Sequence, residues 1–111
     1  MKSSVDHIAI VVEDLEIAEK WYLQHFSGTV THRQENYVRL KLKNTSLALL
    51  SSKYSTSKPH IGILCEEIED LPSDGVKVSH RDGTTGVYKT DPFGNNIEYI
   101  HYDENCQKFI K

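Results

Sequence analysis

The largely apolar segment "VDHIAIVV" spans residues 5–12, and in an extended chain its successive side chains alternate between two faces: Val5, His7, Ala9 and Val11 on one, and Asp6, Ile8, Ile10 and Val12 on the other. Such alternation is typical of a β-strand whose two faces meet different environments. One face carries His7 among small and branched apolar residues, and the other carries the larger side chains Ile8 and Ile10. We expect the aliphatic face to be covered by a helix and the histidine face to look onto a cavity.

The spacing changes to a helical period directly after this strand, in "DLEIAEKWYLQHF". Asp14 is placed to cap the N-terminus of this helix, Glu16 suits its first turn, and Gly28 is placed to end it. The recurrence of Leu15, Ala18, Tyr22 and Phe26 predicts an amphipathic helix with one buried stripe.

Short strands separated by polar turns are expected over the rest of the chain. The predicted ranges are 29–33, 36–43 and 46–51, and then, beyond a Ser- and Lys-rich linker, 60–65, 76–80, 85–91 and 96–102. A second helix is cut to "EEIEDL" and stopped by Pro72, and the turn "DPFGNN" separates the last two strands.

The chain repeats itself. Aligning His7 with His60 places "HIAIVVEDL" on "HIGILCEEI", and "VTHR" and "LALL" then fall on "VSHR" and "IEYI" with small drifts in the offset. An internal duplication explains all three matches. The sequence therefore predicts a single α+β domain over residues 1–111, built of two tandem βαβββ modules that together form a curved sheet. Module one covers about 4–51, the linker 52–59, module two about 60–102, and the tail 103–111.

Two histidines and one carboxylate stand out as candidate metal ligands. His7 and His60 open the first strand of each module, on the face with small neighbours, and Glu98 interrupts the apolar strand "NIEYI". A carboxylate at a core position is costly unless it is paired or bound to a cation. Each residue taken alone is more often structural, but their joint occurrence favours a three-ligand metal site with open positions. Zn, Mn, Fe, Ni and Co all accept these ligands, so the metal stays undetermined.

Composition excludes several functional classes. The net charge of -3 gives no reason to expect nucleic acid as a partner, and the only basic stripe is "VRLKLK". No apolar run is long enough for a membrane span, and "MKSSVDH" lacks the features of a signal peptide. We expect a cytoplasmic protein in which Cys65 and Cys106 are reduced thiols.

The segments "DHIAIVVEDLEIAEKWY", "PHIGI" and "TDPFGNNIEYI" resemble the vicinal oxygen chelate superfamily, which includes glyoxalases, fosfomycin-resistance transferases, bleomycin-resistance proteins and extradiol dioxygenases. The resemblance implies a cup of paired modules with one divalent metal at its centre, held by His7, His60 and Glu98. It also implies a homodimer in which modules pair across subunits, so that one site draws ligands from both chains.

Departures from the family pattern narrow the expected chemistry. The repeat places Ala48 opposite Glu98, so the fourth ligand of glyoxalase I is missing, which argues against lactoylglutathione lyase and methylmalonyl-CoA epimerase activity. Fosfomycin transferases have a threonine at the position of Ala9 in this chain. They also have a basic residue shortly after the final Glu, where this chain offers only Lys108. The segment "HRDGTTG" is a possible counterpart of their cation-binding loop.

The remaining site residues are candidates for catalysis and for substrate binding. Tyr88 lies where the resemblance to fosfomycin transferases implies a tyrosine near the phosphonate, and the catalytic acid or base would be Tyr88 or water. Arg39 and Lys41 are candidates for binding an anionic group of the substrate, although the alternation in "RLKLK" favours an outward, solvated face for both.

Two functional hypotheses follow. The first is a metal-dependent enzyme, of the lyase, thiol transferase or dioxygenase class, acting on a small oxygen-bearing substrate. The second is a metal-free binding protein like those of the bleomycin-resistance group. The histidines favour the enzyme.

Overall fold

The computed structural model describes residues 3–80 and 83–103. The chain divides into two compact units, one made of residues 7–61 and the other of residues 1–6 together with 62–111. Two strands, β1 (Ser4–Val12) and β5 (His60–Leu64), each run from one unit into the other.

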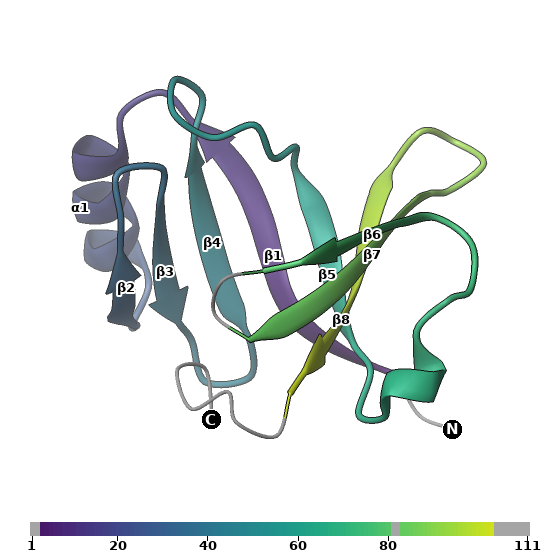
Figure 1. The fold of residues 1–111 in the computed structure, drawn as a ribbon. Helices are drawn as coiled ribbons and strands as arrows, with labels where there is room; N and C mark the ends of the chain where they lie inside the picture. Colours follow the sequence, from purple (N-terminus) through teal and green to yellow (C-terminus); the bar gives the residue numbers. More distant parts are fainter. Residues whose placement is uncertain (1–2, 81–82, 104–111) are drawn as a thin grey trace. The chain divides into compact units, whose positions relative to one another are not determined.

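The unit of residues 7–61 holds a mixed sheet covered by the helix. It contains most of β1, then α1 (Leu15–His25), β2 (Thr29–Arg33), β3 (Tyr37–Lys41) and β4 (Ser46–Ser51). The strand order is β2-β3-β4-β1, with β1 parallel to β4 and the other neighbours antiparallel. Figure 1 shows α1 lying beside β2 and β3.

The two faces of this sheet are filled differently. On the helix side, the buried residues Val38, Leu40, Leu47 and Leu49 form a core with partly buried side chains of α1 and of β1. Full burial of one such side chain contributes about 1.5–3 kcal/mol. The opposite face has a smaller cluster of Ala9, Ala48 and Leu50 packed with Tyr37. Ile10 and Val12 of β1 pack on the helix side as predicted, whereas Ile8 of the same face is exposed.

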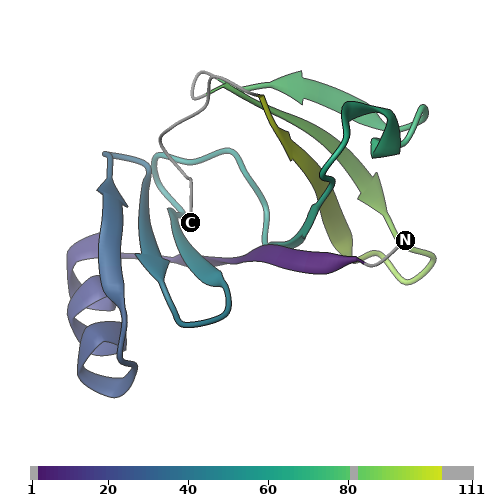
Figure 2. The same ribbon diagram turned by 90° about the horizontal axis from the view of Figure 1, so that it is seen from below.

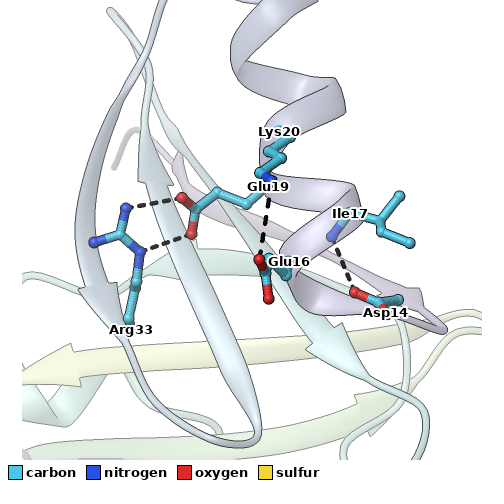
Figure 3. A network of polar contacts seen from close by, with 6 residues as sticks. All are labelled: Asp14, Glu16, Ile17, Glu19, Lys20 and Arg33. Atoms are coloured by element: carbon cyan, nitrogen blue, oxygen red, sulfur yellow. Dashed lines mark hydrogen bonds and ion pairs between the residues drawn. The ribbon is translucent and has the colours of Figure 1, made fainter.

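Local polar contacts fix the start of α1 and its place on the sheet. Asp14 is the N-cap, and its Oδ1 accepts a hydrogen bond of 2.9 Å from the backbone N–H of Ile17. Arg33 of β2 donates two hydrogen bonds of 2.8 Å to the carboxylate of Glu19, which Figure 3 shows as a two-pronged contact between strand and helix. The helix ends at His25, before Gly28.

The other unit is built on an antiparallel meander. Its elements are η1 (Ile68–Asp70), β6 (Val76–Ser79), β7 (Thr84–Thr90) and β8 (Asn96–Tyr102), with strand order β5-β8-β7-β6. Figure 2 shows the hairpin of β7 and β8 beside β6. In the β7–β8 turn, the Asp91 carboxylate accepts hydrogen bonds from the backbone N–H groups of Phe93 and Asn95.

The second helix is a single 3-10 turn, η1. The segment before Pro72 is too short to offset the cost of nucleating an α-helix, and the proline prevents continuation. All strands lie within two residues of their predicted ends. The α+β class and the two tandem modules are therefore confirmed, while the single-domain organisation stays a prediction.

One expectation about β3 is wrong. Lys41 is exposed, as the alternation of "RLKLK" predicted, but Arg39 is buried, with 8% of its surface exposed. Arg39 lies opposite Ala48 of β4 on one side and His32 of β2 on the other. Alternation assigns a residue to one face of a strand, but it does not reveal whether that face is covered by other parts of the protein.

Within the described residues, no helix has the length and apolar character required to cross a bilayer.

Candidate metal centre

Two histidines from different strands meet in the unit of residues 7–61. His7 lies on β1 and His60 begins β5, and both are buried, with 5% and 9% of their surfaces exposed. Their Nε2 atoms are 3.0 Å apart, and the ring planes are nearly perpendicular, at 89°. The two histidines that occupy equivalent positions in the repeat are therefore in direct contact.

The backbone sets the tautomer of His60. Its Nδ1 lies 2.7 Å from the carbonyl oxygen of Lys58, and a carbonyl can only accept, so Nδ1 carries the hydrogen. In the neutral ring this leaves a lone pair on Nε2, which faces His7. A histidine that donates its other ring N–H to a carbonyl is the usual arrangement of a metal-binding imidazole.

The separation of the two nitrogens suits a shared metal ion. Two nitrogens that each lie 2.0–2.1 Å from one metal are about 2.9 Å apart at a right angle and about 3.3 Å apart at a tetrahedral angle. The observed 3.0 Å falls inside this interval. The two rings are thus already arranged as neighbouring ligands.

The predicted carboxylate ligand is buried in the other unit. Glu98 of β8 is 3% exposed, and its Oε2 lies 2.9 Å from Nε2 of His80. Tyr88, which is opposite Glu98 on β7, also hydrogen-bonds to this carboxylate. Burial raises the pKa of the Tyr88 hydroxyl well above its usual range, and the neighbouring negative charge of Glu98 raises it further. The phenol therefore keeps its proton at neutral pH.

The structure also places the remaining candidates. Ala48 lies directly opposite Ala9 of β1 and opposite Arg39 of β3, so the row holds two methyl groups beside a buried guanidinium. Arg39 and Lys41 both lie on the face opposite the helix-side core, but only Arg39 is buried. Lys108, Cys106 and residues 81–82 of "HRDGTTG" lie outside the described residues.

The structure thus groups the sequence candidates into two sets: His7 with His60 in one unit, and Glu98 with Tyr88 in the other. Two imidazole nitrogens and one carboxylate oxygen, all from buried residues, are a donor set that could hold a divalent metal ion. His80 was missed by the sequence reasoning. The sequence does carry a signal for His80, because "VSHR" is one of the repeat matches and places His80 at the position equivalent to His32.

Comparison with known proteins identifies the class. The family model described as the Glyoxalase/Bleomycin resistance protein/Dioxygenase superfamily matches residues 4–99, and the chain belongs to this superfamily. A search of curated proteins found no match.

Solved structures share the fold at low sequence identity. A hypothetical protein, BH1468 from Bacillus halodurans C-125, is 15% identical with a TM-score of 0.73, over 96% of this chain and 99% of that one. A methylmalonyl-CoA epimerase in complex with methylmalonyl-CoA and NH4+ is 16% identical with a TM-score of 0.71, over 94% and 97%. A glyoxalase/bleomycin resistance protein/dioxygenase superfamily member from Vibrio splendidus 12B01 is 13% identical with a TM-score of 0.65, over 90% and 98%.

Proposed function

We propose that this protein is a metal-dependent enzyme of the vicinal oxygen chelate type, in which His7, His60 and Glu98 hold one divalent metal and a small oxygen-bearing substrate completes the coordination. The observation that carries the proposal is the 3.0 Å approach of the two histidine Nε2 atoms, with His60 fixed by the Lys58 carbonyl. Membership of the superfamily supports it.

The burial of Glu98 supports its role as the third ligand. An ionised carboxylate that is almost fully covered requires compensation by donors or by a cation. His80 and Tyr88 supply donors, but a carboxylate has about four lone-pair sites and can accept further partners. The proposal extends to a homodimer, in which the Glu98 of one site comes from either the same chain or the partner chain.

We assign the following roles to the metal and to the residues of this chain. A bound divalent metal supplies Lewis acidity that polarises a substrate oxygen. Tyr88 is the candidate acid or base, and its hydroxyl would have to turn from Glu98 toward the reacting oxygen to take part. The buried Arg39 guanidinium binds an anionic group of the substrate, while the exposed Lys41 contributes long-range attraction at most.

The absence of a carboxylate at position 48 limits the reaction class. A reaction that removes a proton next to a carbonyl needs a positioned base, and Ala48 cannot provide one. The similarity to a methylmalonyl-CoA epimerase structure is therefore a similarity of fold, and we do not assign epimerase activity to this chain. Thiol transfer, dioxygenation and lyase reactions that use another base stay open.

The test is a metal titration followed by an activity screen. Protein stripped with a chelator is titrated with Zn²⁺, Mn²⁺, Co²⁺, Ni²⁺ and, without oxygen, Fe²⁺. Each loaded form is then assayed with catechols, with fosfomycin plus thiols, and with hemithioacetals. The proposal predicts binding of about one metal per chain and metal-dependent turnover of one of these classes. A wild-type protein that takes up none of these metals would instead support a metal-free binding protein.

A further inference from the structure

We infer that His80 is a positioning residue for the Glu98 carboxylate, and that Gly86 is glycine because this pair crosses over it. The inference rests on the proposed metal site, since it concerns the ligand Glu98. It adds one side chain and one backbone position to that site, and both belong to the unit of residues 62–111.

The strand register shows that the contact spans three strands. Val78 of β6 lies opposite Gly86 of β7, and Tyr88 of β7 lies opposite Glu98 of β8. Because side chains two residues apart share a face, His80, Gly86 and Glu98 are on the same face of the meander. His80 directly follows β6 and Glu98 lies on β8; β7 runs between these two strands, so the backbones of β6 and β8 are about 9.5 Å apart.

The two side chains meet above the middle strand. Nε2 of His80 is 2.9 Å from Oε2 of Glu98. A β-carbon added at Gly86 would collide with this Glu98 oxygen, and it would come within 3.1 Å of the His80 Nε2. Gly86 has no positive φ that would itself require glycine. The free space above its backbone is therefore what allows the bridge.

Hydrogen bonding of this kind fixes the orientation of a ligand. The carboxylate can only accept, so His80 Nε2 carries the hydrogen and donates it to Oε2. This bond fixes the orientation of the carboxyl plane. The His80 side chain is 30% exposed, whereas that of Glu98 is 4% exposed, so the histidine covers the buried anion from its solvent side. Removing such an outer partner typically costs 10- to 100-fold in metal affinity.

The experiment compares metal binding by four purified variants with the wild type. His80→Leu removes the donor at similar size, and His80→Asn places an amide too short to reach Oε2. His80→Gln places an amide N–H near the position of Nε2. The matched control is His32→Leu, at the repeat-equivalent histidine of "VTHR" in the other module. Dissociation constants for Zn²⁺ and the visible spectrum of the Co²⁺ form are measured, with thermal melting of the metal-free proteins as a check of folding.

We expect His80→Leu and His80→Asn to bind Zn²⁺ 10- to 100-fold more weakly and to shift the Co²⁺ spectrum. His80→Gln should recover most of the affinity, and His32→Leu should match the wild type. A purely structural role would lower the melting temperature and leave the Co²⁺ spectrum unchanged. If His80→Leu does not fold, the Asn and Gln variants decide, and equal affinities for these two would overturn the inference.

The outcome also separates this inference from the proposed function. Wild-type affinity in the His80 variants together with loss of metal in Glu98→Ala would overturn the role of His80 alone. No metal binding by the wild type would overturn both.

Discussion

The Nε2 atoms of His7 and His60 lie 3.0 Å apart although 53 residues separate them in the chain. His60 Nδ1 lies 2.7 Å from the Lys58 carbonyl and carries the single proton of the neutral His60 ring. Between the two neutral rings, only His7 can then supply a proton. This arrangement is what the duplication predicts if the two strand-opening histidines are ligands of one metal.

Replacing either histidine should abolish tight metal binding. His60→Ala removes one of three ligands and leaves the Nε2 of His7 without its partner, so we expect at least a 100-fold loss of Zn²⁺ affinity. Isothermal titration of chelator-treated protein measures it. His25→Ala, an exposed histidine on α1, is the control. Unchanged affinity in His60→Ala would remove this residue from the site.

Introducing a carboxylate at position 48 should create a fourth ligand. Ala48 is the repeat counterpart of Glu98, and it lies opposite Ala9, two residues from His7 on the same face of β1. Ala48→Glu buries an anion, so the metal-free variant should melt at a lower temperature than the wild type. Zn²⁺ should restore its stability, with tighter binding than in the wild type. Ala48→Gln is the uncharged control, and a variant whose metal affinity is no higher would contradict this placement.

Gly86→Ala should displace the Glu98 carboxylate without replacing any of the proposed ligands. The added methyl group collides with the carboxylate and crowds His80, so one of them must move. Overpacking of this kind typically costs 1–3 kcal/mol of unfolding free energy. Urea denaturation and Zn²⁺ titration should both show a loss. Gly94→Ala, where no atom lies within 4 Å of an added β-carbon but φ is +91°, tests backbone strain alone: it should lower stability and leave metal affinity unchanged.

The ion pair between Glu19 and Arg33 should make a small, pH-dependent contribution to stability. Hydrogen bonds from Arg33 hold the pKa of Glu19 below its ordinary value of 4.5. A carboxyl with a lowered pKa in the folded state stabilises the fold above pH 4.5, and the contribution is lost as the pH falls through the lowered value. The melting temperature of Glu19→Gln should therefore be slightly lower than that of the wild type at pH 7. The two melting temperatures should be equal at a pH below the lowered pKa of Glu19. Because Arg33 is largely exposed, added salt should reduce the difference. A difference that grows on acidification would contradict this account.

A homodimer with shared sites makes a prediction for mixed variants. Light scattering should give about twice the 12.7 kDa mass of one chain. Mixing His60→Ala with Glu98→Ala after denaturation and refolding should then recover one intact site in each mixed dimer, from the histidines of one chain and the glutamate of the other. No recovery of metal binding would place all three ligands in one chain.

The local sequence pattern was sufficient to predict the helices and strands and to select the candidate metal ligands. The alternation in "VDHIAIVV" located the β1 strand and its helix-covered face, and Pro72 marked where the second helix had to end. The repeat supplied His60 and Glu98 as well. These features depend on neighbours a few residues apart or on one duplication, and both can be read from a single chain.

Contacts between distant side chains could not be read in this way. Asp6 shares a strand face with Ile8 and Ile10, yet its carboxylate is fully buried and accepts hydrogen bonds of 2.9 and 3.0 Å from the hydroxyl of Tyr102, 96 residues away. The burial of Arg39 and the bridge from His80 to Glu98 have the same origin, because both depend on which side chains neighbouring strands contribute. Alternation gives the face of a residue and not its partners.

The most direct test of the metal-site proposal is the Zn²⁺ stoichiometry of chelator-treated and reconstituted wild-type protein, measured by elemental analysis after gel filtration. The account predicts about one Zn²⁺ per chain in the wild type, and near zero in both His7→Ala and Glu98→Ala. A wild-type protein that retains no metal, or a Glu98→Ala variant that retains as much as the wild type, would contradict it.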